Sequence, residues 1–178
     1  MNAPKPAPEL QCTQWFNSAE PVTLASLRGK VVVIEAFQML CPGCVAHGLP
    51  QVQKLRRVFP EEHVAVLGLH TVFEHHAAMT PVSLQAFLHE YKIGFPVGVD
   101  TPADDGPIPR TMAAYGMRGT PSLLLIDRAG QLRQHHFGQI EDLALGAQVA
   151  LLMGEAGPEA PAASAGGQNC VVDGGCAP

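Results

Sequence analysis

The sequence lacks several features that would assign it to a class of protein at once. It has no run of 18 apolar residues, so we expect no segment to span a bilayer. Basic residues are few: 11 Lys and Arg against 16 Asp and Glu give a net charge of -5, which argues against nucleic acid and anionic membranes as partners. The stretch from Met1 to Pro8 contains no apolar segment typical of a secretory signal. We therefore expect a cytoplasmic protein, or a periplasmic one if a leader has been removed.

Cysteine is also scarce, and its distribution is uneven. The five cysteines are Cys12, the pair Cys41 and Cys44, and the pair Cys170 and Cys176. A structural disulfide framework would normally be denser and would belong to a smaller domain. Apolar residues are abundant, since 47% of the 178 residues are hydrophobic and 15% are charged. This composition predicts one globular domain with its own core, together with some additional length.

Composition divides the chain into three parts. Residues 1–9 are rich in proline and predict an irregular N-terminal arm. Residues 10–153 contain the apolar runs of a folded domain. Residues 154–178 are rich in Gly, Ala and Pro and show no periodicity, which predicts a flexible tail without a core of its own. The tail nevertheless carries Cys170 and Cys176.

Within residues 10–153, strands are expected to alternate with helices. Apolar runs bounded by turn residues predict strands at 31–37, 63–69, 97–99, 122–126 and 131–137. Helical spacing and capping residues predict helices at 42–58, 81–91, 109–115 and 140–153. The alternation early in the chain and the hairpin late in it predict an α/β fold with a mixed central sheet.

The first long helix has an unusual sequence. Leu49, Val52, Leu55 and Val58 recur every three residues, which predicts one apolar face. Pro50 falls inside the same segment and is expected to kink it.

Cys41-Pro42-Gly43-Cys44 stands between the expected strand 31–37 and this helix. The unpaired N–H groups and the dipole at a helix N-terminus favour an anion, so a cysteine there ionises more readily than a free one. A thiolate is the nucleophile of disulfide exchange. The motif alone also permits two buried core cysteines or half of a zinc site, although a second pair of zinc ligands would have to come from the tail.

Four segments in the same order resemble the thioredoxin-like redoxins of the AhpC/TSA-redoxin superfamily, especially the TlpA-like disulfide reductases. They are Leu27-Arg28-Gly29-Lys30-Val31-Val32-Val33, the Cys-Pro-Gly-Cys motif, Tyr115-Gly116-Met117-Arg118-Gly119-Thr120-Pro121 and Leu124-Leu125-Ile126-Asp127-Arg128-Ala129-Gly130. Two positions depart from the family pattern. Leu40 stands where a Trp usually precedes the first cysteine, and Pro50 falls slightly later than the usual kink proline.

The resemblance implies a thioredoxin fold with a redoxin-type insertion and a cis-proline loop at Thr120-Pro121. It implies that Cys41 is the nucleophile, that Cys44 resolves the mixed disulfide, and that Glu35 lies under Cys44 and exchanges protons with it. The backbone of Thr120 would pair with an extended substrate. The implied activity is that of a thiol-disulfide oxidoreductase, most simply a disulfide reductase, without a cofactor beyond the Cys41–Cys44 disulfide. Its partners would be a disulfide-bearing protein and an upstream thiol reductant, and the protein would be a monomer.

Two other functions remain open from the sequence. A thiol peroxidase shares the Leu-Arg-Gly-Lys segment, but it has Thr or Ser three residues before its reactive cysteine, where this chain has Gln38. A copper-binding thioredoxin-like metallochaperone would use Cys41, Cys44 and His70.

Several further residues have no assigned role. His70, His75 and His76 stand at or after an expected strand end, where α/β proteins gather functional loops. His47 follows Cys44 by one helical turn. Cys170 and Cys176 form a candidate auxiliary redox pair.

Overall fold

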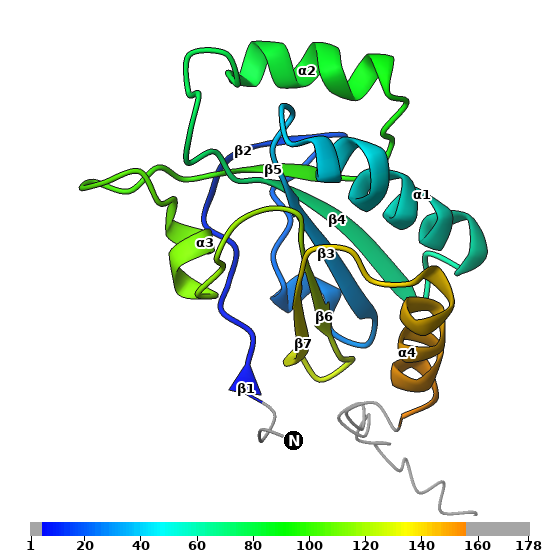
Figure 1. Cartoon of the computed structure of the whole chain (residues 1–178). Coiled ribbons are helices and arrows are strands. Elements are labelled where there is room, and N and C mark those ends of the chain that lie inside the picture. The colour runs from blue at the N-terminus through cyan, green and yellow to red at the C-terminus, as the bar shows by residue number, and fades with distance from the viewer. Residues whose placement is uncertain (1–4, 156–178) are drawn as a thin grey trace, which may run out of the picture.

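A seven-stranded mixed sheet forms the centre of the protein (Figure 1). The computed structural model describes residues 5–155. The strand order is β1-β7-β6-β3-β4-β5-β2, with β3, β4 and β5 parallel and the other neighbours antiparallel. The strands are β1 (Lys5–Pro6), β2 (Cys12–Phe16), β3 (Val31–Phe37), β4 (Val64–His70), β5 (Val97–Asp100), β6 (Ser122–Ile126) and β7 (Gln131–Phe137). The expected α/β fold with a mixed sheet is therefore confirmed.

Helices lie on both faces of this sheet. They are η1 (Ala25–Leu27), the π-helical turn η2 (Cys44–Gly48), α1 (Leu49–Val58), α2 (Pro81–Glu90), α3 (Arg110–Ala114) and α4 (Asp142–Gly154). Buried residues of α1, α2 and α4 pack in one hydrophobic cluster, and Met112 of α3 packs in the other. The helices α1 to α4 each begin or end near a predicted position, and Thr80 caps α2 by accepting a hydrogen bond from the Ser83 N–H at 3.3 Å. None of the helices between residues 5 and 155 is long and apolar enough to cross a membrane.

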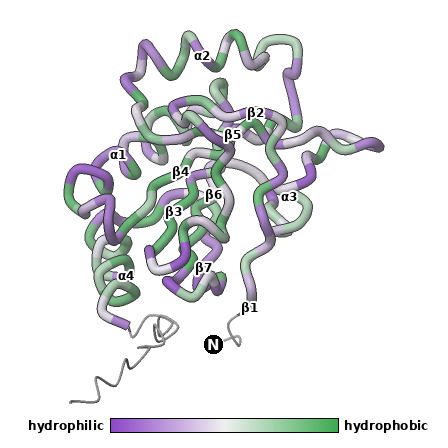
Figure 2. Tube along the Cα trace, turned by 180° about the vertical axis from the view of Figure 1, so that it is seen from behind, coloured by the Kyte–Doolittle hydropathy of each residue, from purple (hydrophilic) through white to green (hydrophobic). Residues whose placement is uncertain are grey.

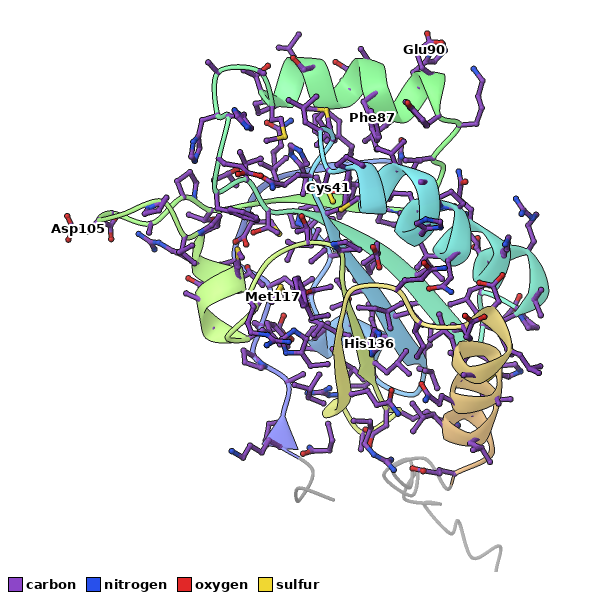
Figure 3. All side chains as sticks on the ribbon, viewed as in Figure 1. Cys41, Phe87, Glu90, Asp105, Met117 and His136 are labelled. Atoms are coloured by element: carbon purple, nitrogen blue, oxygen red, sulfur yellow. The ribbon has the colours of Figure 1, made fainter. Side chains whose placement is uncertain are left out.

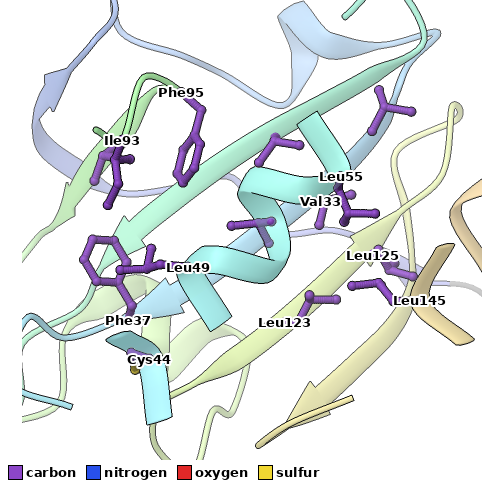
Figure 4. Packing of buried hydrophobic residues seen from close by; sticks show 14 of the residues in the cluster. Val33, Phe37, Cys44, Leu49, Leu55, Ile93, Phe95, Leu123, Leu125 and Leu145 are labelled. Carbon is purple, nitrogen blue, oxygen red and sulfur yellow. The ribbon is translucent and has the colours of Figure 1, made fainter. Parts of the chain in front are cut away.

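The two clusters follow from the alternation of side chains along β3. Val31, Val33 and Phe37 point toward α1 and α4, whereas Val32 and Ile34 point toward α3. All seven residues of this strand are buried, because both faces of the sheet are covered. Figure 2 shows the resulting hydrophobic colour along the central strands, and Figure 4 shows α1 lying over β3 and its neighbours.

The N-terminal arm is more ordered than its composition predicts. Lys5 and Pro6 pair with β7 at the edge of the sheet, where a proline is tolerated because its missing N–H faces away from the ladder. The Glu9 carboxylate accepts hydrogen bonds from the backbone N–H groups of Leu24 and Ala25, both at 2.9 Å. The two-residue strand is the one regular element in residues 5–9, and the partners of this segment are distant in sequence, so its composition does not reveal them.

The sequence also gives no signal for β2. This edge strand pairs antiparallel with β5 and contains Cys12. Its residues are mostly exposed or half-buried, so they lack the continuous apolar run that marks the central strands.

The predicted helix 42–58 is divided in two. The Leu49 N–H bonds to the Cys44 carbonyl, five residues back, so the first segment is a π turn, and Pro50 lies in the first turn of α1. Leu49, Val52 and Leu55 are buried, but Val58 is 71% exposed. A three-residue step turns a helix by about 300°, so three such steps carry Val58 to the opposite side from Leu49. The prediction that Val58 shares the apolar face is therefore wrong.

Candidate active site

Cys41 lies in the turn between β3 and η2, at the carboxyl end of the sheet (Figure 3). Its sulfur accepts a hydrogen bond from the Cys44 backbone N–H at 3.2 Å, and its thiol donates to the Thr120 carbonyl at 3.5 Å. The thiol is partly exposed, so a substrate can reach it. An unpaired N–H at the start of a helical segment is the group that stabilises a thiolate.

Cys44, unlike the partly exposed Cys41, is enclosed in the core. It is fully buried and packs in the same hydrophobic cluster as Phe37 and Leu49 (Figure 4). Burial raises the pKa of the Cys44 thiol, and its hydrogen bond with Cys41 raises it further, against the opposing effects of the Gln38 backbone and the Thr120 side chain. Cys44 therefore stays protonated at neutral pH and needs a base before it can attack a disulfide.

The loop before β6 faces the two cysteines. The Thr120-Pro121 peptide bond is cis. Pro121 lies against the turn that holds the cysteines, and a Cβ built on Gly43 would be 3.3 Å from its Cδ atom. The Ser122 hydroxyl donates to the Gly119 carbonyl at 2.8 Å, which ties the loop to the first residue of β6. This packing fixes the Thr120 carbonyl beside the Cys41 sulfur.

Glu35 is a carboxylate inside the core. It lies in the middle of β3, on the face that packs against η2, and it is 1% exposed. Its Oε1 atom has no hydrogen-bond partner among the described residues. Burial raises the pKa of Glu35 well above its usual range, and the charge of a Cys41 thiolate raises it further. A carboxylate with a raised pKa is a suitable proton acceptor for a buried thiol.

The fold thus brings together Cys41, Cys44, Glu35, Thr120 and Pro121, which the resemblance implied as site residues. The roles assigned to them remain predictions. Cys170 and Cys176 lie outside the described residues.

Gln38 has a positional role that the sequence analysis missed. Its backbone carbonyl accepts a hydrogen bond from the Cys41 N–H at 3.2 Å. Its side chain is 1% exposed, accepts a hydrogen bond from the Phe73 N–H at 3.2 Å and donates to Glu74 at 3.3 Å. Gln38 therefore connects the cysteine turn to the segment after β4. The sequence contains one signal of this role, a polar residue directly after a strand of mainly apolar residues.

The histidines do not gather around the cysteines as a group. His47, His75 and His76 are exposed, whereas His70 is 1% exposed and packs on Phe37 with ring centroids 5.3 Å apart. Neither ring nitrogen of His70 has a partner among the described residues, and burial lowers its pKa to about 4. Between residues 5 and 155, no three His, Cys, Asp or Glu side chains are placed to hold a metal ion.

Cys12 is a third thiol in the described part of the chain, and it lies on β2, away from the motif. Burial, together with the nearby charge of Asp100, raises its pKa to about 12. The thiol of Cys12 is therefore a weak nucleophile at neutral pH.

Comparison with known proteins identifies relatives of the chain and of its fold. The sequence model of the AhpC/TSA family matches residues 3–135. The crystal structure of the thioredoxin-like superfamily protein SPOA0173 is 73% identical, with a TM-score of 0.84 over 86% of this chain and 99% of that one. A thiol-disulfide isomerase from Corynebacterium glutamicum is 51% identical, with a TM-score of 0.82 over 85% and 97% of the two chains. Protein DipZ from Mycobacterium tuberculosis (strain CDC 1551 / Oshkosh) is 30% identical over 136 residues, which are 75% of this chain and 18% of DipZ.

Proposed function

The chain belongs to the AhpC/TSA family, and on that premise we propose that it is a thiol-disulfide oxidoreductase that reduces disulfide bonds in protein substrates. The observation that carries this proposal is the contrast between the two cysteines. The Cys41 sulfur is partly exposed and accepts the Cys44 N–H, while the Cys44 thiol is fully buried at the start of η2, the turn whose last residue, Gly48, lies against the buried Glu35 carboxyl group. One thiol is thus arranged to attack, and the other to resolve.

In the first step, the Cys41 thiolate attacks one sulfur of the substrate disulfide. A bond forms between this sulfur and Cys41, and the other substrate sulfur leaves as a thiolate that takes a proton from water. An extended substrate segment is held by pairing with the backbone of Thr120, whose carbonyl lies 3.5 Å from the Cys41 sulfur.

In the second step, Cys44 gives its proton to Glu35 and attacks the Cys41 sulfur. The bond between Cys41 and the substrate sulfur breaks, and that sulfur leaves as a thiolate that takes a proton from water. The substrate gains two electrons, and the Cys41–Cys44 dithiol becomes a disulfide. An outside thiol reductant then restores the dithiol, so the reaction as proposed uses no cofactor besides this pair, and one monomer suffices for it.

The test is reduction of insulin disulfides by the full-length chain with dithiothreitol as reductant. We expect Cys41→Ser to abolish the catalysed reaction. We expect Cys44→Ser to accumulate a mixed disulfide between Cys41 and the substrate, detectable by mass spectrometry. Cys12→Ser is the matched control, and it should retain the wild-type rate because the high pKa of Cys12 leaves little thiolate at neutral pH.

Two results would overturn the proposal. One is a wild-type chain in which no Cys41–Cys44 disulfide forms or is reduced in any glutathione redox buffer. The other is consumption of hydrogen peroxide without any reduction of protein disulfides, which would favour the peroxidase alternative.

A further inference from the structure

Gly48 lies against the carboxyl group of Glu35. It is the last residue of η2, and it is buried. A Cβ atom built on Gly48 would collide with Glu35 Oε1, would lie 2.9 Å from Glu35 Cδ and would lie 3.4 Å from the Cβ of Pro121. The helix backbone at Gly48 therefore forms one wall of the space that holds the carboxyl group, and Pro121 lies beside the same wall.

Lack of space for a side chain, and not an unusual backbone conformation, explains why residue 48 is a glycine. Gly48 has φ -58° and ψ -57°, which are helical values open to every residue. Glycine is less favourable than alanine inside a helix, so an alanine would stabilise this segment if there were room for its methyl group. Gly146 of α4 provides the comparison, because a Cβ there would meet nothing within 4 Å.

The π turn helps to bring Gly48 into this position. The Leu49 N–H bonds to the Cys44 carbonyl, five residues back, and Pro50 has no N–H to continue a regular helix toward the cysteines. A π turn holds an extra residue in one turn, and such turns occur often at functional sites. Here the turn begins at Cys44 and ends at the glycine that contacts Glu35, so it connects the two groups between which the proton would move.

We propose that Gly48 is a positioning residue for the resolving step: the absence of its side chain sets the place of the Glu35 carboxyl group, and so the transfer of a proton from the Cys44 thiol to that carboxylate. The inference rests on the proposed function. Once the proton has moved, the Cys44 sulfur attacks the Cys41 sulfur, and the substrate sulfur leaves as a thiolate that takes a proton from water. A methyl group at Gly48 displaces the carboxyl group, which is 1% exposed and has no open solvent to move into.

The experiment is a rapid-mixing measurement on full-length Gly48→Ala with a peptide disulfide as substrate. Formation of the mixed disulfide reports attack by Cys41, and release of the second thiol reports resolution by Cys44. We expect attack to stay within about twofold of wild type. We expect resolution to slow by about tenfold or more, because a positioned acid or base contributes about 10²- to 10⁴-fold. Gly146→Ala is the matched control and should change neither rate.

A second pair of variants separates positioning of the carboxyl group from damage to the helix. In Glu35→Asp, the side chain is one methylene shorter and its carboxyl group withdraws toward β3, which relieves the collision of Oε1 with a methyl group at residue 48. Adding Gly48→Ala to Glu35→Asp should therefore change resolution by less than about twofold. If Gly48→Ala alone does not fold, the double variant still tests the inference. It should fold, because the shorter side chain at residue 35 relieves the collision.

The inference is overturned if Gly48→Ala resolves the mixed disulfide at the wild-type rate. It is also overturned if Gly48→Ala slows resolution by the same factor in the Glu35→Asp background as in the wild type. A double variant that also fails to fold overturns it too. Failure of the proposed function itself looks different, because the wild-type chain would then show neither the mixed disulfide nor its resolution.

Discussion

At the scale of single residues, burial displaces the pKa values of Glu35 and His70 in opposite directions. The pKa of Glu35 is raised and the pKa of His70 is lowered, in both cases mainly by burial. Burial favours the neutral form of each group, so the acid keeps its proton up to a higher pH and the base takes one up only at a lower pH. Each shift makes the stability of the fold depend on pH, with opposite signs.

Glu35→Gln should become more stable relative to wild type as pH rises. In the wild type, folded Glu35 holds its proton at pH values where the unfolded chain, with a pKa near 4.5, has lost it. Its contribution to stability is therefore complete below about pH 4.5 and is lost as pH rises through the folded pKa. Urea unfolding of the reduced proteins at a series of pH values measures the difference. A difference that stays constant above pH 4.5 would contradict a raised pKa.

The variant His70→Leu should keep its stability in acid, where the wild type loses stability. Folded His70 has a pKa of about 4, against 6.5 in the unfolded chain, so stability is complete above pH 6.5 and falls as pH drops toward 4. The shift corresponds to about 3 kcal/mol in the free energy of unfolding across this range. The same urea titrations show whether the variant has the flatter pH profile. His76→Leu, at an exposed loop position, is the control and should keep the wild-type profile.

At the scale of elements, one buried carboxylate holds α3 against the sheet. Asp100, the last residue of β5, accepts hydrogen bonds from the N–H groups of Thr111 at 2.8 Å and Met112 at 3.0 Å. It also accepts the Thr71 hydroxyl at 2.9 Å, from the residue that follows β4. Pro109 precedes α3 and supplies no side-chain cap, so Asp100 acts as the N-terminal partner of this short helix. The chain from α3 leads directly into the loop of Thr120.

Asp100→Asn should destabilise the fold by about 2 kcal/mol, since an amide nitrogen would face N–H or O–H donors in place of one carboxylate oxygen. Thermal or urea unfolding measures this loss. Asp105→Asn is the matched control, because Asp105 lies exposed at the tip of the loop before α3, and its substitution should cost less than about 0.5 kcal/mol (Figure 3). Equal losses in the two variants would show that Asp100 has no special anchoring role.

At the scale of the whole molecule, the topology of the sheet assembles the site. The parallel pairing of β3 with β4 and the antiparallel pairing of β3 with β6 place Cys41, the segment after His70 and the Thr120 loop at one end of the sheet. Figure 1 shows the described C-terminal end of α4 at the other end of the molecule, away from the start of η2. Cys170 follows Glu155 by 15 residues, a length that can extend to about 50 Å at most. That length exceeds the diameter of a domain of this size, since its radius of gyration is about 15 Å.

We therefore propose that the pair Cys170 and Cys176 exchanges disulfides with Cys41. Partial oxidation of the full-length chain in a glutathione buffer, followed by peptide mass mapping, should detect links that contain Cys170 or Cys176. The double substitution Cys170→Ser and Cys176→Ser should leave the Cys41–Cys44 disulfide and shift its occupancy at a given glutathione potential. If the map contains only the link between Cys41 and Cys44 at every potential, the tail pair is not an auxiliary redox site.

The sequence by itself determined the central strands, the order of the helices and the position of the Cys-Pro-Gly-Cys motif. These features depend on local patterns: apolar runs, capping residues and turns are contained within a few neighbouring positions. The strands β3 and β6 and the cap at Thr80 appear where those patterns predict them. Resemblance to a family added Glu35, Thr120 and Pro121 as a group, which spacing alone does not supply.

Only the tertiary structure determined the features that depend on contacts between different elements. The pairing of β1 and β2 at the edges joins residues separated by long stretches of chain. The anchoring of α3 by Asp100 and the contact of Gly48 with Glu35 join residues of different elements, which no pattern within one element records. Burial of Glu35 and His70 against other elements sets their pKa values, so neither shift can be found from sequence neighbours. A short sequence pattern reflects only the conformational preference of the residues within it. The stability of an edge strand and the cost of burying a charge depend on the partners that the fold places around them.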